Sequence, residues 1–200
     1  NRAWFRVTDA VPRIARRVRY WDKAGTEGGG ARTAGVLMAE AEGLYYVEHV
    51  VVGQWSWRER DVVIKQTAEA DARKYGGEVE TWLETEPGSG GKQSSQISVQ
   101  DLAGYTVHTE AVAGQGDKVT RAGPFASQCE GGNVRLLRAD WNEGYISEHH
   151  AFPDGGYKDQ VDASSGAFNK LALGQGGPVV ISAAGSGHRE PERRVVVLPG

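Results

Sequence analysis

The pattern of apolar and polar positions in the first third of the chain predicts strands. Runs rich in β-branched and aromatic residues cover 14–22, 33–40 and 44–54, and such runs bounded by turn residues are typical of β-strands. The connections between them contain Gly28-Gly29-Gly30 and Glu42-Gly43. Because short connections favour antiparallel neighbours, we predict an antiparallel meander.

The remainder of the chain alternates between helical and strand-like segments. Ser56 is a suitable N-cap for a helix that runs to about Tyr75, where Gly76-Gly77 is a stop signal. A fourth strand is predicted over 78–84. Further helices are predicted over 93–103, 118–130, 141–151 and 158–173, with short apolar stretches at 104–107 and 134–137. Strands that alternate with helices after a meander indicate an α/β fold.

Three carboxylates lie at the ends of predicted elements. Asp22 ends the first strand, Glu84 ends the fourth, and Asp159 opens the last long helix. Carboxylates supplied by distant segments suit hard cations such as Mg²⁺ or Mn²⁺. Glu86 shares a strand face with Glu84 if the strand continues, and Asp162 lies one helical turn from Asp159, so both are further ligand candidates. The alternative for each is a solvated or arginine-paired acid.

The composition allows one domain with a real core. The 200 residues are 39% hydrophobic, which suffices for a single domain. Cys129 is the one cysteine in the sequence, which excludes an intramolecular disulfide and a CxxC metal site. We find no apolar run long enough to span a membrane and no signal-peptide pattern at the start.

The formal net charge is −3, so we expect weak DNA binding by this segment alone, since affinity for phosphates comes mainly from Lys and Arg. Basic residues nevertheless gather in two places: Arg13, Arg16, Arg17 and Arg19 before Asp22, and Lys118 with Arg121 in mid-chain. Either cluster could contact phosphate or could be a solvated face.

Two further motifs have a weak functional signal. The segment from Gly88 to Lys92 lacks the spacing of a phosphate-binding P-loop, so Lys92 could contact a DNA backbone at a helix start or could belong to a plain turn. His149 and His150 could protonate a leaving oxygen. We favour the interpretation that they are surface residues near a turn.

Six short segments together resemble a known family. They are 19–26, 33–38, 84–92, 116–122, 130–134 and 159–163. In this order they resemble the C-terminal nuclease domain of tailed-phage terminase large subunits, over about Arg17 to about Leu173. No single segment is specific, but their combination and order are.

The resemblance implies an RNase H-like α/β fold over residues 1–173, with a central mixed β-sheet opened by the meander and helices on both faces, followed by a flexible tail over 174–200. It implies a metal-dependent endonuclease that cuts double-stranded concatemeric phage DNA during genome packaging. Asp22 would bridge two Mg²⁺ or Mn²⁺ ions, and Glu84 and Asp159 would each hold one. Lys118 and Arg121 would contact phosphate.

The resemblance also implies a wider assembly. Because the sequence begins at Asn1, we expect a fragment whose upstream part is the packaging ATPase, with the portal and the small terminase subunit as partners. The expected location is the host cell cytoplasm rather than the mature virion. Lys158 departs from the family, which commonly has an acid there, and its ammonium would compete with a second cation.

Two alternatives remain open. A Holliday-junction resolvase or transposase-like nuclease shares the arrangement of acids but gives no reason for the motifs at 116–122 and 130–134. A non-cleaving DNA-gripping module of the packaging motor is the alternative outside enzymes. Cleavage of plasmid DNA with Mn²⁺ or Mg²⁺ separates a nuclease from a gripping module.

Overall fold

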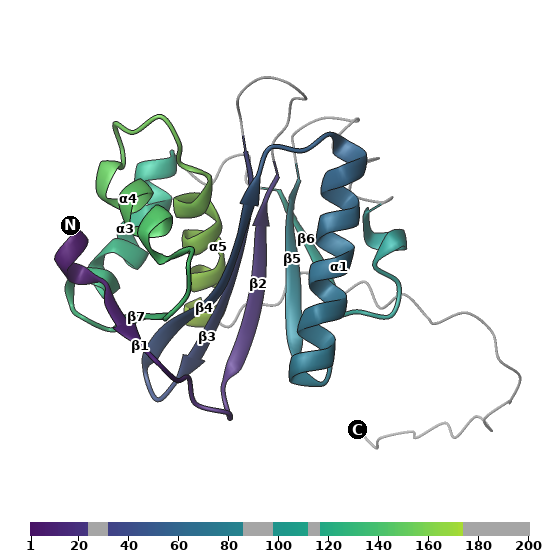
Figure 1. Ribbon diagram of the computed structural model, residues 1–200, viewed down its shortest axis with the longest axis horizontal. Coiled ribbons are helices and arrows are strands. Elements are labelled where there is room, and N and C mark those ends of the chain that lie inside the picture. The colour runs from purple at the N-terminus through teal and green to yellow at the C-terminus, as the bar shows by residue number, and fades with distance from the viewer. Residues whose placement is uncertain (24–31, 86–97, 112–116, 174–200) are drawn as a thin grey trace, which may run out of the picture.

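A mixed β-sheet forms the centre of the protein in a computed structural model (Figure 1), which describes residues 1–23, 32–85, 98–111 and 117–173. Its seven strands in these residues have the order β1-β7-β4-β3-β2-β5-β6. They are β1 (Arg6–Thr8), β2 (Arg16–Asp22), β3 (Thr33–Ala41), β4 (Leu44–Gly53), β5 (Val79–Thr85), β6 (Val107–Ala111) and β7 (Val134–Leu137). The β2-β3-β4 meander is antiparallel and the other pairings are parallel.

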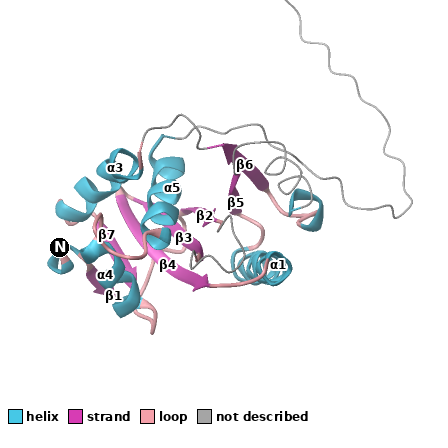
Figure 2. Ribbon diagram, turned by 90° about the horizontal axis from the view of Figure 1, so that it is seen from above, coloured by secondary structure: helices cyan, strands magenta, loops and turns pink. Residues whose placement is uncertain are grey.

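Helices cover both faces of this sheet (Figure 2). One face carries α1 (Trp57–Tyr75), and the other carries α3 (Lys118–Glu130), α4 (Asn142–Ala151) and α5 (Asp159–Leu173). A short 3-10 helix, η1 (Arg2–Trp4), lies near α4. The prediction of an α/β fold with a mixed sheet and helices on both faces is confirmed. None of the described helices is both long and apolar enough to cross a membrane.

Local sequence signals set the ends of α1 as predicted. Ser56 and Glu59 form a reciprocal capping box at its start, and Gly76 ends it with a φ of 66°, a left-handed conformation that glycine adopts without strain. Two strands were not predicted from the sequence, β1 and β6, because both are short and lie at the edges of the sheet. The predicted helix over 93–103, the residues Glu86 and Lys92, and the tail over 174–200 lie wholly or partly outside the described residues.

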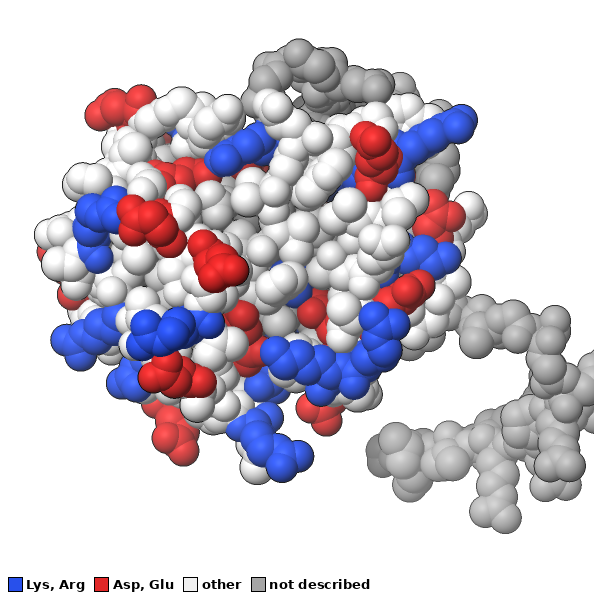
Figure 3. Space-filling view, in the orientation of Figure 1, with Lys and Arg blue, Asp and Glu red and all other residues white. Residues whose placement is uncertain are grey.

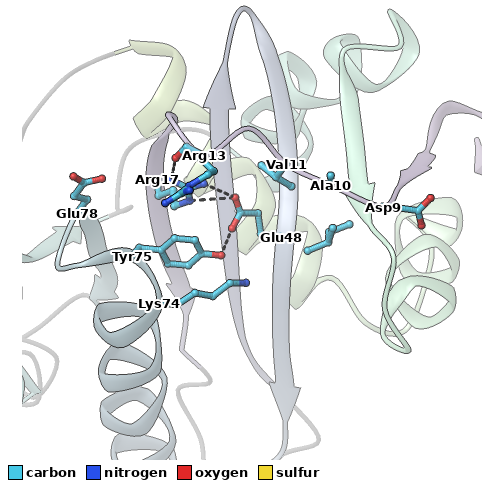
Figure 4. Close-up of a pocket in the computed structure, with 10 residues that line it drawn as sticks. Asp9, Ala10, Val11, Arg13, Arg17, Glu48, Lys74, Tyr75 and Glu78 are labelled. Atoms are coloured by element: carbon cyan, nitrogen blue, oxygen red, sulfur yellow. Dashed lines mark hydrogen bonds and ion pairs between the residues drawn. The ribbon is translucent and has the colours of Figure 1, made fainter.

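Buried ion pairs, rather than apolar contacts alone, fix the α1 face. The guanidinium of Arg19 is fully buried and donates to both carboxylate oxygens of Asp71 on α1, at 2.8 and 2.9 Å. Arg17 is also buried and donates to Glu48 at 3.1 Å, while Tyr75 donates to the second oxygen of Glu48 (Figure 4). Charges removed from water must be paired, and these are.

This network changes the interpretation of the basic cluster before Asp22. Arg17 and Arg19 are committed to internal carboxylates, and Arg16 donates to the carbonyl of Leu171 at 3.2 Å. Arg13 lies at a hollow of about 550 Å³ that Arg17, Glu48 and Tyr75 also line (Figure 4). On the face in Figure 3, basic and acidic side chains are intermixed. The cluster is therefore largely structural and forms no exposed basic stripe.

On the opposite face, α5 packs very closely against β2. A Cβ atom at Gly166 would lie 2.4 Å from the Tyr20 ring, which is closer than carbon atoms approach without a clash. Tyr20, Phe168 and Leu171 are buried in the larger hydrophobic cluster, which this face shares with α3 and α4. The hydrogen bond from Arg16 at the start of β2 to Leu171 near the end of α5 shows that the two elements run in opposite directions. The start of α5 therefore lies at the carboxyl end of β2.

We predict that Gly166→Ala destabilises the protein by about 1–3 kcal/mol, because the added methyl group has no room beside the buried Tyr20 ring. Helix propensity alone favours alanine by about 1 kcal/mol, so the packing cost determines the sign. Gly144→Ala in α4 is the matched control, since nothing lies within 4 Å of its Cβ position. Urea unfolding checks this, and equal stabilisation by both substitutions would contradict the close packing.

Candidate active site

Asp22 and Glu84 are neighbours at the carboxyl ends of β2 and β5. These parallel strands pair Trp21 with Leu83, so the next residues on each strand are the two acids. Side chains alternate between the faces of a strand, and Tyr20 and Trp82, two residues earlier, both lie in the cluster beneath α5. Both carboxylates therefore face the α5 side of the sheet.

The first turn of α5 brings two more acids to the same place. Gly166 rests on Tyr20, and one turn earlier in the helix lies Asp162, which is 5% exposed. Burial, then the charges of Glu84 and Asp162, and then that of Asp159, raise the pKa of Asp22 well above its ordinary value, although Lys118 opposes the shift. The four acids are thus close enough to interact electrostatically.

Three cations are paired with the α5 acids. Lys118 on α3 donates to one oxygen of Asp162, and Arg121 lies 3.5 Å from the other. Arg32, just before β3, lies 3.3 Å from Asp159. The predicted phosphate-contacting residues Lys118 and Arg121 therefore lie at the acidic cluster, where they neutralise part of its charge.

The donor set fits a divalent cation in its chemistry. Every candidate atom is a carboxylate oxygen, the ligand preferred by Mg²⁺ and Mn²⁺. Oε2 of Glu84 is buried and has no hydrogen-bond partner in the structure. Yet within the described residues no three His, Cys, Asp or Glu side chains are gathered closely enough to hold a metal ion. The ion pairs of Asp159 and Asp162 account for this, since their carboxylates are turned toward Arg32 and Lys118.

A further acid, Glu110 on β6, supports the floor of the site. It is the register partner of Glu84 and accepts hydrogen bonds from Tyr20 at 3.0 Å and from Lys170 at 2.6 Å. Lys170 also lies over the ring of Trp82. Sequence reasoning missed Glu110, because β6 was not predicted and the partners of this acid lie 60 and 90 residues away.

Comparison with known proteins agrees with this arrangement. The family described as the terminase RNaseH-like domain matches residues 19–171. This chain belongs to that family. No curated protein matches it in sequence.

Solved terminase nucleases share the fold. The large terminase nuclease of thermophilic phage G20c, with bound zinc, is 14% identical, with 78% of this chain and 82% of that chain covered and a TM-score of 0.58. The human cytomegalovirus terminase nuclease domain is 11% identical, with 82% and 86% covered and a TM-score of 0.60. For the large terminase of another thermophilic bacteriophage, solved in complex with ADP, the values are 13%, 84%, 42% and 0.55. At these identities the likeness shows the RNase H-like fold.

The histidine pair of this terminase domain is not arranged as expected from the sequence. His149 is not a surface residue: its ring packs against Tyr145, Phe5 and Phe125. Its Nδ1 lies 2.8 Å from the carbonyl oxygen of Tyr145, and burial lowers its pKa to about 4. His150 is exposed, as expected. His149 is part of the aromatic core, so the structure gives it no contact with the acids.

Lys158 stands directly before the acidic turn of α5. Its carbonyl oxygen accepts from the backbone N–H of Asp162 at 2.9 Å. Among the described carboxylates, none forms an ion pair with its ammonium group, in contrast to Lys118 and Arg32. The competition with a cation that we expected from Lys158 is therefore better placed on Lys118 and Arg32.

We predict that Asp22→Asn stabilises the metal-free fold at pH 7 by about 0.5–2 kcal/mol, the usual gain when a strained site is relieved. The pKa of Asp22 is raised on folding, so its ionised form weakens the fold as pH rises from 3.8 through the folded pKa. The gain should therefore disappear below pH 3.8.

Urea unfolding at pH 7 and at pH 3.5, both with chelator, checks this. Asp101→Asn, which removes an exposed acid, is the control and should change stability by less than about 0.5 kcal/mol. Loss of stability in Asp22→Asn at pH 7 would show that its carboxylate is not destabilised by its neighbours.

Proposed function

We propose that this terminase domain is a metal-dependent endonuclease that cuts double-stranded concatemeric DNA during genome packaging. The observation that carries the proposal is the convergence of Asp22, Glu84 and the first turn of α5 at one end of an RNase H-like sheet. Buried like charges are costly unless a cation balances them, and acids gathered at such a cost are typical of functional sites.

Asp22, Glu84 and Asp159 would hold the ions, two per site, with Asp162 as a further ligand. Glu86 lies outside the described residues and stays a candidate. A bound Mg²⁺ or Mn²⁺ supplies positive charge that polarises the scissile phosphodiester and stabilises the charge that develops during its hydrolysis. Zinc, magnesium and manganese occur in the names of solved terminase nucleases, which supports a divalent cation.

The chain's own cations orient the substrate in this proposal. Lys118 is half-exposed, so its ammonium can leave Asp162 and contact a phosphate oxygen while a metal ion takes over the neutralisation of that carboxylate. Arg121, more buried, would keep its position beside the acids. Lys92 would contact the backbone outside the described residues. Such contacts position DNA without reading its sequence.

We further propose that the domain acts within the packaging motor in the host cytoplasm, joined to an ATPase domain in the same polypeptide, with the portal and the small subunit as partners. The phage large terminase that has been solved in complex with ADP supports this, because the present chain covers 42% of it. A non-cleaving DNA-gripping module is the second candidate. It is favoured by the ion pairs that hold Asp159 and Asp162 away from a shared metal position.

We expect the wild-type chain to nick and linearise plasmid DNA with Mn²⁺, less with Mg²⁺, and not with excess chelator. Asp22→Asn should lose at least about 100-fold in rate, because a metal-ligating charge is removed while the side-chain shape is kept. Circular dichroism confirms folding, and Asp101→Asn is the control. An active Asp22→Asn protein, or cleavage that persists with chelator, would remove the proposed mechanism, whereas DNA binding without cleavage would favour the gripping module.

Lys118 is expected to contact phosphate when DNA is bound. In the Asp22→Asn background, Lys118→Gln should weaken DNA binding and lower the slope of log affinity against log salt by about 1. Lys65→Gln, an exposed lysine on α1 at the opposite sheet face, is the matched control. Fluorescence anisotropy at several salt concentrations measures both slopes. If the Lys118→Gln slope equals that of wild type, Lys118 serves only Asp162.

A further inference from the structure

The acidic turn of α5 is held in place by a carboxylate from another helix. Glu148, on α4, accepts the backbone N–H of Gln160 at 2.7 Å through one oxygen and the Gln160 side-chain amide through the other. The first N–H groups of a helix lack partners within the helix, and a negative charge there is favourable. Glu148 thus caps α5 from outside and fixes the turn that carries Asp159 and Asp162.

Arg32 connects this cap to one of the acids of the site. Its Nη2 donates to Glu148, its Nε lies 3.3 Å from Asp159, and its guanidinium covers the ring of Tyr157 at 3.7 Å. The side chains of Arg32, Glu148 and Asp159 are 19%, 4% and 15% exposed. At such burial, water screens their charges only in part.

The two acceptors of Arg32 have different roles. The Glu148 carboxylate lies at the helix cap, whereas Asp159 is a candidate metal ligand. If a divalent cation takes Asp159, Arg32 keeps its contacts with Glu148 and Tyr157, so the guanidinium has a place to remain. Without Glu148, the carboxylate of Asp159 would be the remaining partner of this strong cation.

Resting on the proposed function, we propose that Arg32 and Glu148 are a pair of positioning residues that set the affinity of Asp159 for a divalent cation. Arg32 competes with the metal for the carboxylate. Glu148 weakens that competition by binding Arg32 and by capping α5. The two residues therefore act on metal affinity in opposite directions, which a merely structural role for both would not produce.

Mn²⁺ binding to the DNA-free 200-residue chain, measured by isothermal titration calorimetry, tests this without relying on activity. Arg32→Gln should tighten Mn²⁺ binding, and Glu148→Gln should weaken it, each by about three- to tenfold, as expected for one partly screened charge. Glu148→Gln keeps the shape and one oxygen that can accept the Gln160 N–H. Arg138→Gln, which removes an exposed arginine paired with Asp9, is the charge control and should leave the affinity unchanged.

A double variant separates the pair from two independent effects. With Arg32→Gln already present, Glu148→Gln should change Mn²⁺ affinity far less than it does alone, since the competitor is gone. Arg32→Lys keeps the charge but cannot contact both carboxylates as a planar fork, so its affinity should lie between those of wild type and Arg32→Gln. Circular dichroism and urea unfolding establish that each variant is folded.

The outcomes distinguish this inference from the function on which it rests. Opposite shifts that collapse in the double variant support it. Equal affinities, or weakening by both single substitutions in folded proteins, overturn it while leaving the nuclease proposal intact if wild type binds Mn²⁺ and cuts plasmid. A folded wild type that neither binds Mn²⁺ nor cuts DNA overturns both.

Discussion

The close contact between Tyr20 of β2 and Gly166 of α5 is the constraint on which the candidate site depends. A side chain at position 166 would keep the helix away from the sheet. With glycine there, the helix axis lies close to β2 and runs against its direction, so the helix start meets the strand end. Asp162 and Asp159 are thereby placed beside Asp22, and a shift of the helix by one turn would separate them by about 5 Å.

The concentration of acids at this end of the sheet has an electrostatic cost. Asp22 and Glu84 have raised pKa values, first because of burial, and for Asp22 next because of Glu84. Lys118, Arg121 and Arg32 offset part of this cost by pairing with the α5 acids. The cluster is therefore balanced without a metal ion, but by flexible side chains that a divalent cation can displace. This arrangement suits a site that must bind and release both ions and DNA.

The other sheet face carries charges with a different role. Arg19 and Asp71 form a bidentate pair between β2 and α1, and Arg17, Glu48 and Tyr75 form a second network nearer the start of β2. Breaking such buried pairs is costly because one charge is left alone. They hold β2 from the side opposite the site, so the strand that carries Asp22 is fixed by apolar packing on one face and by ion pairs on the other.

Local signals in the sequence are enough to define most of the elements and the type of chemistry. Periodicity and capping residues predict the meander, α1 and α5, and Asp22 and Glu84 can be selected as acids at strand ends. Which charges meet depends on the folded arrangement instead. Arg32 and Glu148 are 116 residues apart in sequence and Tyr20 and Glu110 are 90, so no local pattern joins them. The same holds for Arg17 and Arg19, which are internal, and for His149, which belongs to the core, since the direction of a side chain depends on which surface its element covers.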